Sequence, residues 1–222
     1  MVAVMGAPAT GKTTLTLRLG QAQGYQVFRI REHVPDTILA AAATSVDQPE
    51  RIDDVTVVRA LRGYVERVVF DASIHTVLLD DFPGSGTQAR LLLGVLRRLA
   101  PACAVHAVEL VADRRVRDHR VATRRVCHRC ERDPVHDPRI PAQASRSDPN
   151  RCARCGGVLH PRRGDAPRLL VARTQHYAEQ ALGIRATFAE AGITVLQLDA
   201  SRSVETLAAE LRELLVVSGA RP

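Results

Sequence analysis

Residues 6–13 read GAPATGKT, and this segment decides the fold. It is the phosphate-binding loop pattern, in which two glycines five positions apart are followed by Lys12 and Thr13. The apolar run at 2–5 before it suits a strand, and residues 12–23 after it suit a helix. A strand, a loop and a helix in this order direct backbone N–H groups and the positive end of the helix toward nucleotide phosphates.

Lys12 stands out by composition as well as by motif. It is the only lysine among the 31 basic residues, and all the others are arginines. We expect its ammonium group to reach the β- and γ-phosphates of ATP, while Thr13 or Thr14 holds magnesium. The alternative is a chance glycine-rich turn, which the flanking strand and helix disfavour. The predicted ATP-binding residues of the loop are Ala9, Thr10, Gly11, Lys12, Thr13 and Thr14.

Apolar runs separated by helical patterns continue along the rest of the chain. Strands that alternate with helices indicate a mostly parallel sheet covered on both faces. Asp80 ends one of these runs, at a place where an acid commonly faces magnesium directly or through water. On its own this signal is weak, since an aspartate after a strand also caps turns and helices. The predicted strands are residues 2–5, 27–30, 76–80, 105–111 and 193–198.

Length and composition favour one soluble α/β domain with small insertions. A chain of 222 residues suits a single core. No apolar run approaches the roughly 18 residues of a membrane span, and no export signal is evident, so we expect a cytoplasmic protein without a membrane partner. The net charge of +7 and the pI of 9.8 favour an anionic partner, which leaves both nucleotides and nucleic acids open.

Four of the five cysteines form two CxxC pairs separated by 21 residues. Two glycines follow the second pair, as in a zinc knuckle, so we expect a structural zinc ion in a closed shell of four thiolates. An iron cluster is the alternative metal, and His128, His136 or His160 could replace one cysteine. The predicted ligands are Cys127, Cys130, Cys152 and Cys155.

A zinc ribbon that binds nucleic acid is the competing interpretation of this segment, because its surroundings are basic. No aromatic residue lies between Cys127 and Cys155, however, so a platform for stacking single-stranded bases is not expected there. We therefore expect no nucleic-acid partner.

Arginines flank the cysteine segment on both sides. Arg120 and Arg124 lie four positions apart in a helical stretch, and hence on one face, while Arg162 and Arg173 follow the segment. An insertion with arginines on both sides can close over a triphosphate and stabilise the charge that develops during transfer. A catalytic lid is the prediction, and an ordinary solvated basic face is the alternative.

Several motifs together resemble those of the adenylate kinase family of nucleoside monophosphate kinases, in its zinc-lid bacterial form. GAPATGKTT is similar to the family's GAPGxGKGT, and LLDDFPGSGTQA to LLDGFPRTxxQA. RVATRRVCHRC resembles RLxGRRxCPxC, and CARCGGVLHPRRGD with RLLVARTQHY resembles CDxCGGxLxxRxDD with RxRLxxY. The resemblance covers most of the chain.

The resemblance implies a P-loop NTPase fold, with a five-stranded parallel sheet flanked by helices, a small helical acceptor-binding arm and a Cys₄ zinc lid. It implies that Arg120 lines the adenine site, that Gln88 faces the acceptor base, and that MgATP is the phosphoryl donor. Lys12 and the arginines 124, 162 and 173 would act on the transferring phosphates, the last two also binding the acceptor. The implied division is core 1–30, arm 31–54, core 55–124, lid 125–163 and core 164–222.

The departures from the family pattern fall on the acceptor side. The acceptor signature STGDxxR is RIREHVP here, so that Ile30 replaces a threonine and Pro35 an arginine. A second acceptor arginine is replaced by Gly84, and the glycine that follows the LLD motif is replaced by Asp81. Both arginines that would hold the acceptor phosphate are therefore missing, which predicts an acceptor other than ordinary AMP.

Three functions follow from these features. The first is phosphoryl transfer from MgATP to a nucleoside monophosphate or related nucleotide by a monomeric enzyme. The second is transfer to a non-nucleotide metabolite, and the third is a nucleotide-dependent nucleic-acid-binding module. Candidate acceptor residues are Glu32 and Asp81, either of which could meet a cationic or hydroxyl-rich acceptor or act as a base, and Arg29, Arg31 or Arg51, which could replace the missing arginines.

Overall fold

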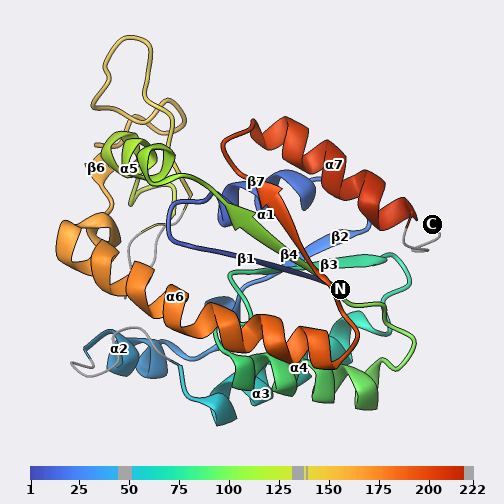
Figure 1. Ribbon diagram of the computed structural model, residues 1–222. Helices are drawn as coiled ribbons and strands as arrows, with labels where there is room; N and C mark the ends of the chain where they lie inside the picture. The colour runs from blue at the N-terminus through green and yellow to red at the C-terminus, as the bar shows by residue number, and fades with distance from the viewer. Residues whose placement is uncertain (45–51, 132–137, 139, 218–222) are drawn as a thin grey trace.

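The computed structural model describes residues 1–44, 52–131, 138 and 140–217. A five-stranded parallel sheet in the order β2-β3-β1-β4-β7 forms its centre, with helices on both faces (Figure 1). The predicted fold class, an α/β P-loop fold, is confirmed. No helix in the described ranges combines the length and the apolar character that crossing a bilayer requires.

All five predicted strands are present. β3 has the predicted bounds, and β2 lies two residues earlier than the predicted range 27–30. The central strand β1 and its neighbour β3 are buried at every position, because helices cover both faces of a parallel sheet. The strands are β1 (Val2–Gly6), β2 (Tyr25–Phe28), β3 (Thr76–Asp80), β4 (His106–Val111) and β7 (Val195–Asp199).

Helices pack in two layers. α1 and α7 cover one face of the sheet through Leu15, Leu19 and Leu211, whereas α3, α4 and α6 cover the other through residues such as Leu92 and Phe188 (Figure 1). The helices are α1 (Lys12–Leu19), α2 (Asp36–Thr44), α3 (Asp54–Val68), α4 (Gly86–Leu99), α5 (Arg114–Thr123), α6 (Pro167–Glu190) and α7 (Val204–Val217), with the short 3-10 helices η1 (Ile30–His33) and η2 (Arg163–Asp165).

The helix expected over residues 12–23 is shorter than predicted. It ends at Leu19, and the backbone N–H of Gly20 closes the last turn on the carbonyl of Thr16. Glycine has a poor helix propensity, and Gly24 next adopts a positive φ that a helix does not allow. The two glycines in this segment are the physical reason for the early end.

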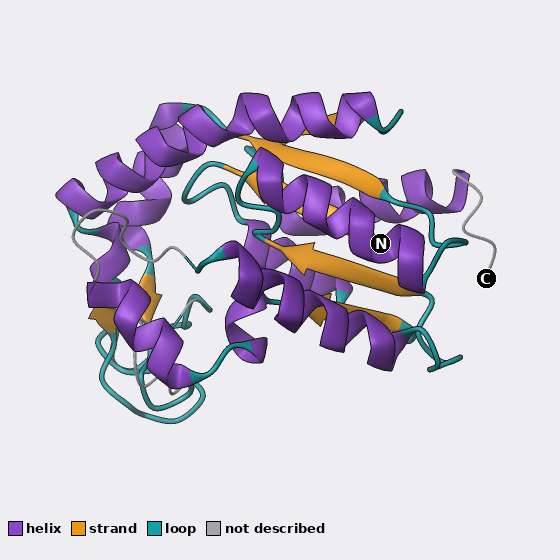
Figure 2. Cartoon of the chain, turned by 90° about the horizontal axis from the view of Figure 1, so that it is seen from below, coloured by secondary structure: helices purple, strands orange, loops and turns teal. Residues whose placement is uncertain are grey.

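The cysteine segment forms a small unit of its own. β5 (Arg125–Val126) pairs with β6 (His160–Pro161) in an antiparallel two-stranded sheet at its base. Figure 2 shows this small sheet and its long loops beyond the carboxyl ends of the strands of the main sheet. Cys127, Cys152 and Leu159 form a hydrophobic cluster separate from the two main cores, as a segment stapled by a metal would have.

Glu109 is a buried carboxylate in the middle of β4, and no sequence pattern points to its partners. It accepts hydrogen bonds from Tyr177 Oη (2.5 Å), from Arg185 Nε and Nη2 (3.0 and 2.7 Å) and from Gln197 Nε2 (3.2 Å). Burial by itself would raise the pKa of Glu109, but the bonds from Arg185 and Tyr177 outweigh it and lower the pKa below the ordinary 4.5. This network ties α6 to the neighbouring strands β4 and β7.

We predict that Glu109→Ala lowers the free energy of unfolding by about 1–3 kcal/mol, because it removes the buried acceptor that Tyr177, Arg185 and Gln197 share. Urea denaturation at pH 7 measures it, and Glu179→Ala on the exposed side of α6 serves as the matched control, with a loss below about 0.5 kcal/mol. Since the native pKa is depressed, the stabilisation is complete above pH 4.5 and declines as the pH falls through the lower native pKa. Equal stability of the two variants at pH 7 would contradict this role.

Candidate functional site

The loop between β1 and α1 makes a tight turn, with the backbone N–H of Thr10 donating to the carbonyl oxygen of Ala7. Gly6 and Gly11 have φ values of +147° and +96°, and Ala9 between them has +66°. A Cβ atom on Gly6 would lie 2.6 Å from the carbonyl oxygen of Leu110, so a side chain there would collide with β4. α1 begins after Gly11 without a side-chain cap, which leaves its first N–H groups for an anion.

The ammonium group of Lys12 lies under this loop. It donates to the carbonyl oxygens of Gly6 (2.7 Å) and Ala7 (3.0 Å) and lies 3.4 Å from Asp81 Oδ1. Burial lowers the pKa of Lys12 below the ordinary 10.5, and the nearby Arg173 lowers it further, while Asp81 and Asp80 act in the opposite direction. A buried cation with this environment is stabilised by an anionic ligand.

Asp80 and Thr13 meet at the end of β3, as predicted for a magnesium site. Thr13 Oγ1 donates to Asp80 Oδ1 at 3.3 Å, and the side chain of Asp80 is fully buried. Thr14 is exposed on the outer side of α1, so of the two threonines Thr13 is the one beside Asp80. A hydroxyl and a carboxylate are hard oxygen ligands, and this donor set fits Mg²⁺.

Arg29, directly after β2, joins Asp80 at the end of β3 to Glu32 in η1. Its Nε donates to Asp80 Oδ2 at 3.0 Å, and its Nη1 donates to Glu32 Oε1 at 2.6 Å. Of the other two candidate acceptor arginines, Arg31 lies in η1, and Arg51 lies outside the described residues. The structure places Arg29 against Asp80.

Asp81 has a strained backbone. Its φ of +58° is in the left-handed region, which costs roughly 1 kcal/mol for a residue with a Cβ atom. Its N–H donates to Val4 O at 3.1 Å, and its carboxylate is the partner of Lys12. A glycine would relieve the strain but would provide no carboxylate for Lys12.

Arg120 reaches from α5 to the phosphate loop. Its Nη1 donates to the carbonyl oxygens of Ala9 (3.4 Å) and Thr10 (3.0 Å), and its Nη2 donates to that of Ala200 (2.5 Å). The predicted ATP-binding residues of the loop and Arg120 therefore lie together.

Arg124 does not continue the helix, contrary to the prediction that it shares a helix face with Arg120. α5 ends at Thr123, and Arg124 adopts an extended conformation with ψ of 131°. Its guanidinium group therefore turns away and donates to both carboxylate oxygens of Asp165, with Nε at 2.7 Å from Oδ2. Arg120 therefore donates to the phosphate loop, whereas Arg124 pairs with Asp165 at the base of the lid.

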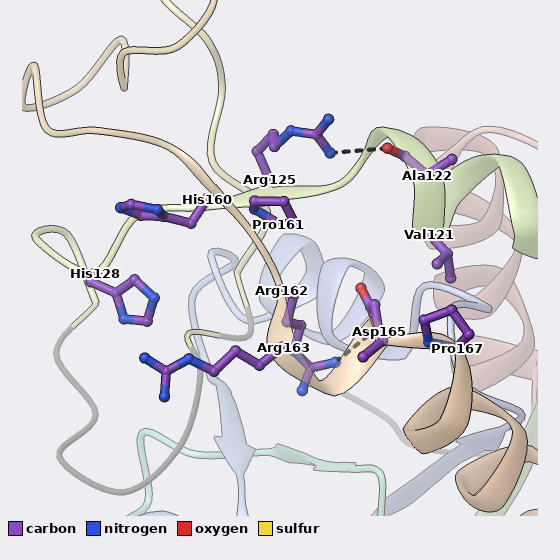
Figure 3. A pocket seen from close by; sticks show the side chains of 11 residues that line it. Val121, Ala122, Arg125, His128, His160, Pro161, Arg162, Arg163, Asp165 and Pro167 are labelled. Atoms are coloured by element: carbon purple, nitrogen blue, oxygen red, sulfur yellow. Dashed lines mark hydrogen bonds and ion pairs between the residues drawn. The ribbon is translucent and has the colours of Figure 1, made fainter.

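The remaining lid arginines converge on the same acid. Arg162 Nη1 and Arg173 Nη1 lie 3.7 and 3.9 Å from Asp165 Oδ1, and Figure 3 shows Arg162 beside Asp165. Asp165 is buried and was missed as a site residue, although a single acid at the end of the basic segment HPRRGD was the available signal. It orients three predicted catalytic arginines in one place.

A cavity of about 730 Å³ adjoins this cluster at the base of the lid. Figure 3 shows side chains that line it from α5, from the two-stranded sheet and from the start of α6. Three of them are arginines and two are histidines, so its lining is basic; these residues are Arg125, Arg162, Arg163, His128 and His160.

Gln88 lies at the start of α4, near the acceptor side. Its Oε1 accepts from the N–H of Gly84 at 2.9 Å, so the side chain also fixes the turn before α4. The predicted acceptor residues Glu32, Asp81 and Gln88 thus each have a protein partner. Among the described residues, this geometry excludes none of the predicted acceptor residues, and their roles stay predictions.

The four cysteines form one cluster, and their Sγ atoms all lie within 4.8 Å of one another. The Sγ distances are 3.4 Å for Cys127–Cys155 and 3.7 Å for Cys130–Cys152. A tetrahedral zinc site with Zn–S bonds of about 2.3 Å has S–S distances of roughly 3.8 Å, so the cluster fits zinc.

The histidine alternatives do not enter this cluster in the described part of the chain. The metal-binding group found there contains the four cysteines alone, while His128 and His160 form a ring pair with centroids 5.6 Å apart. His136 lies outside the described residues. The four-cysteine ligand set is the one that the structure supports.

The arrangement of loop, lysine and acid at the carboxyl ends of β1 and β3 defines a P-loop nucleotide-binding protein. No protein-family model matches the chain. An adenylate kinase of Syntrophotalea carbinolica is 30% identical over 201 residues, which span 86% of this chain and 87% of the relative. An adenylate kinase of Bacillus licheniformis is 24% identical over 220 residues, or 96% of both chains. The chain belongs to the adenylate kinase family.

We predict that the purified protein contains one zinc ion per chain, measured by elemental analysis. Cys152→Ser is expected to lose the ion and to lower the melting temperature, because the lid cluster has little apolar core without it. The control is Cys103→Ser, which changes a thiol outside the cluster. A full complement of zinc in Cys152→Ser, or iron in place of zinc in the native protein, would contradict the assignment.

We also predict that Asp81→Gly binds ATP about threefold to tenfold more tightly, because it removes the carboxylate that competes with phosphate for Lys12. Relief of the positive φ is expected to add up to about 1 kcal/mol of stability. Asp81→Asn, which removes the charge and tolerates the left-handed conformation, separates the two effects. Titration calorimetry and urea unfolding measure them, and weaker ATP binding by both variants would refute the competition.

Proposed function

We propose that this protein transfers the γ-phosphoryl group of MgATP to a nucleoside monophosphate or a related nucleotide. The proposal rests chiefly on the gathering of cationic groups from distant segments at one end of the sheet. Lys12 comes from the phosphate loop, Arg120 from α5, and the group Arg124, Arg162 and Arg173 from the base of the lid. The relatives named adenylate kinase support the same reaction class.

In the proposed reaction an oxygen of the acceptor phosphate attacks the γ-phosphorus, and the bond from that phosphorus to the β–γ bridging oxygen breaks. The products are ADP and a nucleoside diphosphate, and a dianionic acceptor phosphate loses no proton. Catalysis then consists of alignment and charge stabilisation. Lys12 and the lid arginines would hold the non-bridging oxygens, and Arg120 would hold the donor against the loop.

Magnesium, held by Thr13 and Asp80, would offset charge on the β- and γ-phosphates. Zinc would have a structural part only, since four thiolates close its shell. In this proposal the arm 31–54 and the lid 125–163 are the two units that enclose the substrates, and the segments 1–30, 55–124 and 164–222 form the core. The protein is proposed to act as a monomer.

A second candidate function is phosphorylation of a hydroxyl group on a non-nucleotide metabolite. One observation favours it: the half-exposed carboxylate of Asp81 lies beside Lys12, where it could accept the hydroxyl proton as the new P–O bond forms. This candidate requires Asp81, whereas transfer to a monophosphate does not. Loss of all turnover in Asp81→Asn would favour the hydroxyl acceptor.

The proposed function is tested by incubating the protein with MgATP and a panel of purine and pyrimidine nucleoside monophosphates, and by identifying products with ³¹P NMR. We expect one or more nucleoside diphosphates with equivalent ADP. Arg173→Lys should reduce kcat by about tenfold or more with nearly unchanged ATP binding, because lysine keeps the charge but lacks the planar fork. Absence of any nucleoside diphosphate would disprove the proposal.

A further inference from the structure

Helix α6 carries Arg173 on a part of the helix that the main core does not hold. Arg173 lies in the first half of α6, where most side chains are exposed, and the buried positions begin at Ala181. The second half packs closely on α4. A Cβ atom on Gly86 would lie 2.8 Å from the carbonyl oxygen of Gly183, and Thr187 Oγ1 donates to Gly86 O at 3.4 Å. The first turns of α6 reach toward α5 and β6 (Figure 1).

Tyr177 connects this first half to the main sheet. Its Oη donates to Glu109 Oε1 at 2.5 Å, whereas Arg173 Nη1 donates to the carbonyl oxygen of Gly164 in η2. Counted from the start of α6, Tyr177 is the first residue that bonds to a strand of the main sheet within the described ranges. Arg173 and Tyr177 lie four positions apart, and hence on one face of the helix. A shift of the Tyr177 side chain would therefore move Arg173 with it.

Glu109, at the other end of this bond, is fixed relative to the phosphate loop. It lies opposite Met5 of β1, the residue directly before Gly6, which begins the loop. Two bonds from Arg185 and one from Gln197 hold its carboxylate independently of Tyr177. The Tyr177–Glu109 bond therefore fixes the first half of α6 relative to the strand that carries the loop.

The surroundings of Tyr177 keep its hydroxyl a donor. Burial and the bond to Glu109 raise the pKa of Tyr177 above the ordinary 10.0, and Asp81 adds to the rise. Arg173 is one of the charges that lower the pKa of Lys12. Since Lys12 and Asp81 are paired at the phosphate loop, Tyr177 and Arg173 are both within electrostatic reach of that pair. The phenol stays protonated at neutral pH.

We propose that the Tyr177–Glu109 hydrogen bond is a positioning device that holds the first half of α6 so that Arg173 faces the transferring phosphates. Tyr177 is a positioning residue, because it acts through Arg173. Both residues belong to the segment RLLVARTQHY, in which only the arginine was a predicted site residue. This inference rests on the proposed function, because it concerns an arginine that would stabilise the transferred charge in that reaction.

The test compares two variants that each remove one bond to the same carboxylate. Tyr177→Phe keeps the ring and removes the bond from α6, whereas Gln197→Leu, the matched control, removes the bond from β7. Both are expected to fold, because Arg185 continues to neutralise Glu109. With MgATP and the nucleoside monophosphate that the native protein uses best, Tyr177→Phe should lower kcat by about tenfold, with a KM for ATP within about twofold of native. Gln197→Leu should keep the native kcat.

A double-mutant cycle with Arg173→Lys shows whether Tyr177 acts through Arg173. In the Arg173→Lys background, Tyr177→Phe should lower kcat by less than about twofold, because lysine already lacks the planar fork that needs positioning. A merely structural role of Tyr177 predicts the same loss in both backgrounds, and that result would overturn the proposal.

Hydrogen exchange tests the anchor without turnover. In Tyr177→Phe the backbone amides of residues 170–177 should exchange about tenfold faster than in the native protein, while those of residues 184–190 keep the native rate. Gln197→Leu should leave both halves of α6 unchanged. Native exchange rates over residues 170–177 in Tyr177→Phe would overturn the proposal, even if the native protein makes nucleoside diphosphates.

The outcomes separate this inference from the proposed function. Faster exchange confined to the first half of α6, in a protein that makes no nucleoside diphosphate, would support the anchor and refute the proposed function. Native kcat in Tyr177→Phe, in a protein that does make nucleoside diphosphates, would overturn the positioning role and leave the proposed function in place.

Discussion

The confinement of positive charge at one edge of the sheet is the constraint on which the rest of this structure depends. Lys12 is buried under the phosphate loop, Arg29 is mostly buried beside β3, and Arg124 lies at the base of the lid. Cations in such places are costly unless each has an anion within reach. In the protein alone those anions are carboxylates: Asp81 for Lys12, Asp80 for Arg29, and Asp165 for the three lid arginines.

This pairing connects the fold to the proposed chemistry. Parallel strands end at the same edge, so β1 and β3 bring Lys12 and Asp80 together, and β5 and β6 bring Arg124 and Arg162 to one base. A triphosphate would offer the same cations stronger acceptors than the carboxylates do, at the cost of displacing Asp81. The cations are therefore oriented before the nucleotide arrives, as electrostatic catalysis requires.

The parts of the molecule that depend on local sequence patterns could be predicted from the sequence. The phosphate loop, all five strands and the cysteine cluster follow from spacing and periodicity, and the structure confirms them. The partners of Glu109, and the pairing of Asp165 with Arg124, could not be foreseen, because these bonds join residues 41 to 88 positions apart. At Arg124 the local periodicity extended the helix too far: α5 ends at Thr123, and Arg124 pairs with Asp165, 41 positions away.

Binding of MgATP to the native protein and to Lys12→Met tests the account most directly. We predict one ATP bound per native chain and at least a hundredfold loss of ATP affinity in Lys12→Met. The midpoint of urea unfolding of Lys12→Met should be unchanged or higher, because the substitution removes a buried cation whose pKa is lowered by burial. Affinity within about threefold of native would contradict it, since the site would then not depend on the charge at its centre.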